Sequence, residues 1–263
     1  MKVTMMRTIL AAVVIGFAAP ALAAGDSVAP PAQKWSFTGA FGTYDRAELQ
    51  RGYQVYKEVC AACHAMKYVA FRNLADPGGP GFTAAEVKAL AATFEVTDGP
   101  NDAGDMFKRA ALPSDKFPSP FPNEKAARAS NGGAYPLDLS LIAKARDHGR
   151  REGAGADYIK ALLTGYKDAP AGFALGEGLN YNEYFAGHQI AMPQPLNADQ
   201  VTYADGTKAT VDQMAHDVSA FLMWAAEPKL EERKRMGFKV MIFLVVLTGL
   251  FFAAKKRIWA KLH

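Results

Sequence analysis

The chain has 263 residues and a formal net charge of +4, which is distributed unevenly. Cations are concentrated near the two ends, so residues 25–228 contain more acidic than basic side chains. An acidic body of this kind is unsuited to binding nucleic acid and would instead attract a basic partner. This body is long enough to form one domain with a substantial core.

A secretory signal peptide is predicted for residues 1–24. A basic start precedes a short apolar run, and Ala21-Leu22-Ala23 has the small residues of a cleavage site. The alternative is a first membrane helix, but Pro20 interrupts the apolar run. We therefore expect residues 25–228 to form an exported domain.

The first helix predicted in this body starts at Asp45. Glu48 follows three residues later, which is the spacing of a capping box. The helical period places aromatic and aliphatic side chains on one face together with both cysteines of the chain. The members of this face are Leu49, Tyr53, Tyr56, Cys60 and Cys63.

The sequence Cys60-Ala61-Ala62-Cys63-His64 contains the only two cysteines of the chain. C-x-x-C-H is the pattern of covalent c-type haem attachment. Residues three and four apart on a helix share a face, so both thiols and the imidazole can reach one planar macrocycle. The thiols would bond to the two haem vinyl groups, and His64 would be the proximal iron ligand. We expect one covalently bound haem c, and no disulfide.

Two other uses of the cysteines compete with haem attachment. A structural zinc site normally has four Cys or His ligands, and the sequence offers no second Cys pair or closely spaced His pair. A C-x-x-C redox switch does not require the following histidine and usually lies near a βαβ pattern, which the sequence does not show.

Further helices are predicted downstream, separated by loops rich in Pro and Gly. Thr83 with Glu86, and Thr210 with Gln213, are N-terminal capping signals. The predicted helices cover residues 83–94, 139–147, 156–164 and 210–227. No convincing alternating strand is found, so the sequence predicts a mainly α, loop-rich domain wrapped around its cofactor.

The sixth iron ligand is expected from a methionine or a histidine. Met192 lies in a loop with Pro193 and Pro195 on its C-terminal side, which could hold a thioether at a fixed depth. A Met/His ligand pair raises the haem potential. The alternatives lie in contexts more typical of surface or core residues; they are His148, His188, His216, Met106, Met214 and Met223.

The last predicted element is a membrane anchor at about residues 236–255. Between residues 236 and 254 the only charge is Lys239, and about 20 mostly apolar residues can span a bilayer. Basic clusters at 233–235 and 255–257 flank the segment. The alternative is a buried core helix, but the segment has no polar face.

The two ends together predict the topology. Residues 229–263 would form a single-pass anchor with a short cytoplasmic tail. Because the signal peptide directs export, the haem domain would lie on the periplasmic side of a bacterial inner membrane.

Sequence strings from the haem motif to the anchor resemble one family. They cover residues 51–57, 66–72, 98–101, 121–123, 126–129, 138–140, 162–166, 191–193, 224–228 and 233–237. In these strings the chain resembles the cytochrome c1 family, the haem subunits of ubiquinol–cytochrome c oxidoreductase. The resemblance runs from about Trp35 to the end of the anchor.

The resemblance implies roles for four residues outside the haem motif. Met192 would be the axial thioether, Arg146 and Tyr158 would lie near the haem propionates, and Asn131 would fall in a segment that lines the haem crevice. Leu137 departs from the pattern, because the family often has a second proline there. Some bacterial members brace the loop before the axial methionine with a disulfide. Here residues 165–189 contain no cysteine, so other packing must hold Met192.

The resemblance also implies a fold and a function. The fold would be a class I cytochrome c-like haem domain with loop extensions and one C-terminal transmembrane helix. The protein would be an electron carrier and not an enzyme on its own. It would take single electrons from a Rieske iron–sulfur protein and pass them to a soluble or tethered c-type cytochrome, beside cytochrome b in a dimeric complex and in contact with membrane lipid.

Two alternative functions stay open at this point. One is a membrane-tethered cytochrome that serves an oxidase or a photosynthetic reaction centre. The other is a haem enzyme or gas sensor with an open distal site, which would lack a committed Met192 and need a polar distal pocket.

Overall fold

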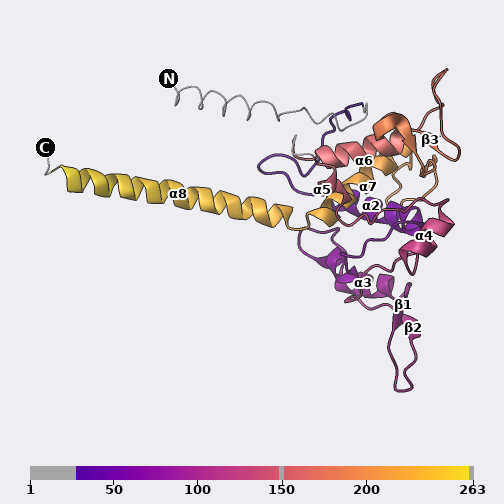
Figure 1. The fold of residues 1–263 in the computed structure, drawn as a ribbon. Coiled ribbons are helices and arrows are strands. Elements are labelled where there is room, and N and C mark those ends of the chain that lie inside the picture. Colours follow the sequence, from indigo (N-terminus) through magenta and orange to yellow (C-terminus); the bar gives the residue numbers. More distant parts are fainter. Residues whose placement is uncertain (1–27, 148–150, 261–263) are drawn as a thin grey trace, which may run out of the picture.

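The computed structural model describes residues 28–147 and 151–260 (Figure 1). The predicted signal peptide, His148 and the last residues to His263 lie outside the described residues. A helical body is followed by one long C-terminal helix that projects away from it.

The core of the body is the crossing of α2 (Arg46–Glu58) and α7 (Val211–Ala226). The helices approach closely at Gly52, where an added Cβ would lie 2.1 Å from the backbone oxygen of Asp217. Any larger residue at position 52 would therefore push the helices apart. Tyr53 and Tyr56 of α2 pack their rings against Phe221 of α7.

The N-terminus of α2 differs in part from the prediction. Asp45 is the N-cap, and its carboxylate accepts hydrogen bonds from the backbone N–H groups of Ala47 and Glu48. The reciprocal half of the expected capping box is absent, because the Asp45 N–H donates to the Ser36 hydroxyl. Glu48 instead accepts from Ser36 and pairs with His216 on α7.

The other predicted helices exist with altered bounds. Thr83 and Glu86 form the expected capping box of α3, which ends earlier than predicted. The segment predicted as helical at 139–147 contains only a short helix, and one further helix was not predicted. The observed bounds are α3 Ala84–Ala91, α4 Glu124–Ser130, α5 Ile142–Ala145 and α6 Ala154–Thr164. Short 3-10 helices lie at Cys60–Ala62 (η1), Phe71–Ala75 (η2) and Ala186–His188 (η3).

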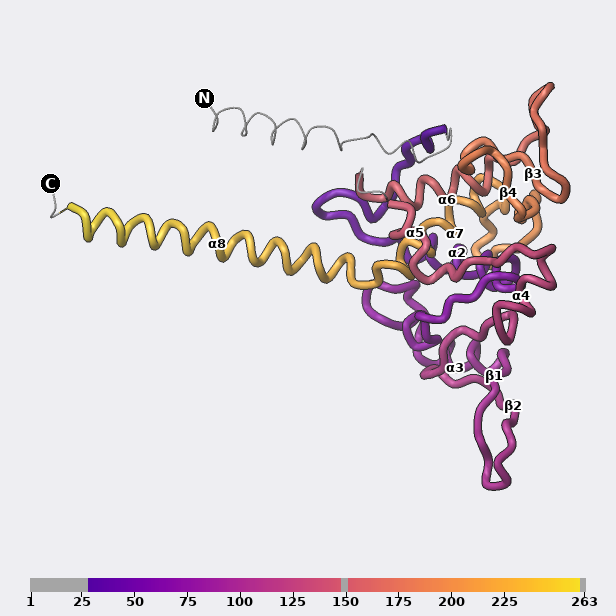
Figure 2. The backbone as a smooth tube through the Cα atoms, in the orientation of Figure 1, coloured from indigo at the N-terminus to yellow at the C-terminus, as the bar shows by residue number. Residues whose placement is uncertain are grey.

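The expectation of no strands was wrong. β1 (Glu95–Asp98) pairs antiparallel with β2 (Phe107–Ala110), and this hairpin projects from the body (Figure 2). A second small pair joins β3 (Asn180–Tyr181) to β4 (Gln189–Ile190). The strands are short and none of the residues in β1 or β2 is buried, so they lack the apolar alternation by which strands are usually found.

The long helix α8 (Leu230–Trp259) has the length and composition to cross a membrane. None of its most apolar window is buried against the body, which excludes the alternative of a core helix. The mainly α fold with one C-terminal apolar helix is thus confirmed. The helix starts before the predicted anchor, because it continues through the basic cluster at 233–235.

Candidate haem site

The haem motif lies on the turn that follows α2. The α-helix ends at Glu58, and Cys60–Ala62 forms η1. The backbone N–H groups of Cys63 and His64 both donate to the Cys60 carbonyl, at 3.1 and 2.9 Å. The motif is therefore not on the α-helix as predicted, although the turn keeps the i, i+3 and i+4 relation of the three side chains.

His64 is oriented by one hydrogen bond. Its Nδ1 lies 2.7 Å from the backbone oxygen of Leu137, and since a carbonyl can only accept, Nδ1 must carry the proton. The lone pair is thereby assigned to Nε2, the nitrogen left to bind a metal. Burial lowers the pKa of His64, which favours the neutral imidazole that iron ligation needs.

The segment that contains Leu137 is hydrogen-bonded to the residues that follow the haem motif. Leu139 N–H donates to the Ala65 carbonyl at 2.8 Å, and Lys67 N–H donates to Asp138 Oδ2 at 3.0 Å. The Tyr68 N–H donates to the Ser140 hydroxyl. Because a backbone oxygen holds His64, the leucine at position 137 does not prevent this contact.

The two thiols are free and differ in environment. Cys60 is half-buried and Cys63 is exposed. Burial, with a smaller effect of Cys63, raises the pKa of the Cys60 thiol to about 12, so this thiol is neutral at pH 7. Within residues 28–147 and 151–260, no cluster of three or more His, Cys, Asp or Glu side chains is placed to hold a metal ion. The zinc alternative therefore has no ligand set in that part of the chain.

Met192 lies in a loop whose backbone is held without a disulfide. Its side chain packs against the hydrophobic core. Its carbonyl accepts hydrogen bonds from the Tyr166 hydroxyl at 3.0 Å and from Asn180 Nδ2 at 3.4 Å. Asn180 also pairs with Ile190 across β3 and β4. These contacts hold the Met192 loop in place without a disulfide.

Most of the alternative axial ligands are committed elsewhere. Met214 and Met223 are buried in the core, and Met106 is exposed on the β1–β2 hairpin. His216 stacks on Trp35 at 4.3 Å between ring centroids. His188 stacks on Tyr181 at 5.6 Å. Met192 therefore stays the predicted axial ligand.

The predicted propionate residues are brought together. The Arg146 guanidinium lies over the Tyr158 ring, 5.6 Å from its centroid. Burial raises the pKa of Tyr158, and Arg146 opposes that rise. Asn131 is the C-cap of α4, and its amide donates to the Ala127 carbonyl at 2.7 Å. That contact accounts for Asn131 locally and does not join it to the other predicted residues.

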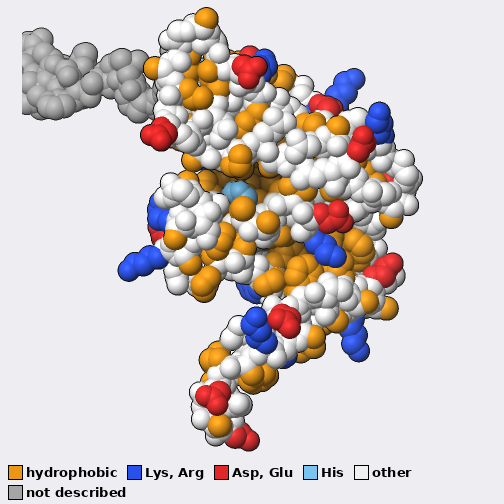
Figure 3. All heavy atoms as spheres, turned by 90° about the vertical axis from the view of Figure 1, so that its right-hand side faces the viewer, with side chains coloured by type: hydrophobic (Ala, Val, Ile, Leu, Met, Phe, Trp, Pro, Cys, Tyr) orange, Lys and Arg blue, Asp and Glu red, His pale blue; other side chains and the backbone are white. Residues whose placement is uncertain are grey.

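Only some of the residues that orient the candidate ligands could be predicted from the sequence. The Leu137 carbonyl and the Tyr166 and Asn180 side chains were not predicted to act. A backbone acceptor has no sequence signature, and the two side chains meet Met192 only through the fold. Figure 3 shows one face of the body, with a hollow lined largely by hydrophobic side chains and with a histidine in it.

The donor set fits a c-type haem. Two uncrosslinked thiols and an imidazole with a free Nε2 lie on one turn. The family model described as "Cytochrome C1 family" matches residues 35–262. The chain belongs to the cytochrome c1 family. Members of this family are haem-binding cytochromes, which confirms the family and the cofactor class expected from the sequence.

Named relatives cover most of the chain. The chain is 54% identical over 247 residues to "Cytochrome b/c1" of Bradyrhizobium diazoefficiens, covering 89% of the chain and 36% of that protein. It is 51% identical over 251 residues to "Cytochrome c1-2, heme protein, mitochondrial" of Solanum tuberosum, covering 94% and 93%. It is 51% identical over 240 residues to "Cytochrome b-c1 complex catalytic subunit, mitochondrial" of Candida albicans, covering 91% and 78%. The chain thus spans about a third of the Bradyrhizobium protein and most of the other two.

Proposed function

We propose that this protein is the haem-bearing electron-transfer subunit of a cytochrome bc1 complex. The observation that carries the proposal is the His64 Nδ1 contact with the Leu137 carbonyl, which leaves Nε2 for iron beside two free thiols. Family membership supports the same function. The protein would relay electrons and would not be an enzyme on its own.

Different residues would hold different parts of the haem. Cys60 and Cys63 would attach it covalently, and His64 and Met192 would bind its iron. Arg146 and Tyr158 would offer a cation and a hydroxyl to the propionates, and Asn131 would line the haem crevice as the resemblance implies. A bound haem supplies reversible one-electron iron chemistry. The chain would supply the ligands and hold them in position.

The partners and membrane arrangement follow from this role. The Rieske iron–sulfur protein would donate the electron, and a soluble or tethered c-type cytochrome would accept it, with cytochrome b beside α8 in a dimeric complex. Residues 1–24 would be the signal peptide, and residues 25–228 the periplasmic haem domain. Residues 229–263 would form the single-pass anchor, with the C-terminus in the cytoplasm of a bacterium. The apolar composition of α8 supports the anchor.

Covalent attachment through Cys60 and Cys63 gives a direct test of the proposal. Acidified acetone should leave essentially all haem on the chain, because thioether bonds survive acid. The denatured chain should also stain for haem peroxidase activity on a gel. The Cys60→Ala/Cys63→Ala variant should lose the stain. Full extraction of haem from the wild-type protein would refute the central assignment.

The β1–β2 hairpin is the proposed docking element for a basic cytochrome. It contains Asp98, Asp102 and Asp105, three of the four carboxylates at residues 95–105. Asp98 pairs with Arg109 at 2.5 Å, so its charge is already balanced. Asp102 and Asp105 are exposed and are left as the main steering charges.

Neutralising these steering charges should slow association with a basic cytochrome. In the Asp102→Asn/Asp105→Asn variant, we expect the rate constant for electron transfer to a basic cytochrome to fall several-fold at low salt. Its salt dependence should also weaken, because the Debye length falls from ~30 Å at 0.01 M to ~10 Å at 0.1 M. Asp199→Asn/Asp212→Asn changes two exposed carboxylates outside the hairpin and is the control. An unchanged salt profile in the hairpin variant would place docking elsewhere.

A further inference from the structure

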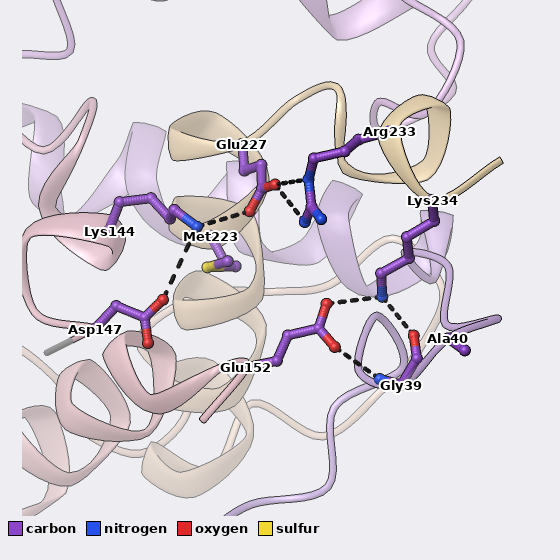
Figure 4. Close-up of a pocket in the computed structure, with 9 residues that line it drawn as sticks. All are labelled: Gly39, Ala40, Lys144, Asp147, Glu152, Met223, Glu227, Arg233 and Lys234. Atoms are coloured by element: carbon purple, nitrogen blue, oxygen red, sulfur yellow. Dashed lines mark hydrogen bonds and ion pairs between the residues drawn. The ribbon is translucent and has the colours of Figure 1, made fainter. Parts of the chain in front are cut away.

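A charged cavity lies where the body meets the base of α8 (Figure 4). Its volume is about 460 Å³, within the usual range of small-ligand sites. The lining brings together segments that are distant in sequence, and it contains three cations and three carboxylates. These are Lys144, Arg233 and Lys234, and Asp147, Glu152 and Glu227.

Several of these charged side chains form ion pairs with one another. Glu227 accepts from Lys144 Nζ at 2.9 Å and from Arg233 Nε at 2.6 Å. Lys234 Nζ has three acceptors: Glu152 at 2.8 Å and the carbonyls of Phe37 and Gly39 at 2.5 and 2.7 Å. Lys234 and Glu227 are therefore occupied in joining α8 to the body.

One donor and one acceptor remain. Arg233 uses Nε and Nη2 for Glu227, and within residues 28–147 and 151–260 its Nη1 has no acceptor. Its side chain is 59% exposed. Asp147 Oδ1 is buried and has no hydrogen-bond partner in the same part of the chain, while Oδ2 is 3.9 Å from Lys144 Nζ. The cavity thus presents a spare guanidinium N–H on Arg233 and, at Asp147 Oδ2, an accessible carboxylate oxygen that lies beyond hydrogen-bond distance of Lys144.

The cavity lies at the level of lipid headgroups. The apolar part of α8 begins at Met236, and a rise of 1.5 Å per residue puts Arg233 only ~4.5 Å before it along the axis. The polar layer of a bilayer is roughly 5–7 Å thick on each side of the hydrocarbon core. When α8 spans the membrane, Arg233 is therefore inside the layer that contains phosphates.

We propose that this cavity binds the headgroup of an ethanolamine phospholipid, with the phosphate on Arg233 and the primary ammonium on Asp147. A zwitterion matches a lining with equal numbers of both charges, whereas an anionic headgroup would add negative charge beside three carboxylates. A choline headgroup has no N–H to donate to Asp147. The site requires only that α8 enters the bilayer, so it goes beyond the electron-transfer function and stands apart from it.

The test measures lipid binding to the haem-loaded full chain. The delipidated protein in detergent is titrated with phosphatidylethanolamine, phosphatidylcholine or phosphatidylglycerol of identical acyl chains, and bound lipid is counted by native mass spectrometry. We expect phosphatidylethanolamine to bind about tenfold more tightly than phosphatidylcholine, as one charge-assisted hydrogen bond predicts. Asp147→Asn should abolish this preference, whereas Asp212→Asn, which changes an exposed carboxylate outside the cavity, should keep it.

A second pair of variants tests the phosphate contact. Arg233→Gln should weaken the binding of both zwitterionic lipids. The control is Lys229→Gln, which removes a cation outside the cavity whose side chain is 71% exposed. It should not change the binding of either lipid. The visible haem spectrum reports folding of each variant. Equal binding of the two zwitterionic lipids by the wild type, tightest binding of phosphatidylglycerol, or wild-type lipid binding by Arg233→Gln would each overturn the proposal.

Discussion

Replacing Met192 by leucine is expected to remove the sixth iron ligand. The weak sulfur-to-iron charge-transfer band of the oxidised protein should disappear, and carbon monoxide should bind the reduced iron. The potential should fall by a sizeable part of the roughly 0.8 V range over which axial ligands move haem potentials. Absorption spectra and a redox titration of the full chain measure all three effects.

Two further variants separate ligation from packing. Met106→Leu changes an exposed methionine on the hairpin and should leave the spectrum and potential unchanged. Tyr166→Phe removes a hydrogen bond to the Met192 carbonyl, so it should loosen the loop and lower the potential by less than Met192→Leu. A Met192→Leu protein with the wild-type spectrum and potential would show that another residue binds the iron.

Replacing Arg51 by methionine is expected to destabilise the body by about 3–5 kcal/mol, because it leaves a buried carboxylate without its cation. Asp217 on α7 has a fully buried side chain. It accepts from Arg51 Nε at 2.9 Å, from Arg51 Nη2 at 3.0 Å and from Gln213 at 3.0 Å. Most domains have an unfolding free energy of only ~5–15 kcal/mol, so the expected destabilisation is a large fraction of the total stability. Denaturant unfolding of the full chain in detergent measures it.

The control for Arg51→Met is a surface pair. Arg128 pairs with Glu124 one turn away on α4, with about half of each side chain exposed. Arg128→Met should therefore cost only about 0.3–0.5 kcal/mol. The double variant Arg51→Met/Asp217→Leu should recover most of the lost stability, since apolar residues can replace a buried pair. An Arg51→Met protein as stable as Arg128→Met would mean that Asp217 is not held as a buried charge.

Sequence motifs predicted those parts of the fold whose contacts join residues close together in the sequence. Thr83 and Glu86 predicted the start of α3, because both halves of that capping box lie within one turn. Asp45 predicted only the start of α2. The partner of its N–H is Ser36, which arrives from a preceding loop, and Glu48 is drawn to His216 on α7. Such tertiary partners override local pairing and cannot be found from spacing alone.

The same distinction applies to the candidate site. The haem motif was visible because its three side chains are close in sequence, whereas its 3-10 conformation was not. The support of Met192 depends on Asn180, which lies in the β3–β4 pair, and on Tyr166, which comes from the segment after α6. The β1–β2 hairpin was missed because its strands are stabilised by pairing and not by a buried face.

The contacts at the base of α8 also set the timing of folding during synthesis. Glu231 accepts from the Tyr44 N–H, 187 residues earlier, and Lys234 reaches the Phe37 carbonyl, 197 residues earlier. Ribosomes add ~5–20 residues per second, so these partners are separated by roughly 10–40 seconds of translation. For that interval these two contacts cannot form, because their C-terminal partners have not yet been synthesised. The long sequence separation of these contacts therefore makes the joining of α8 to the body a late event in folding.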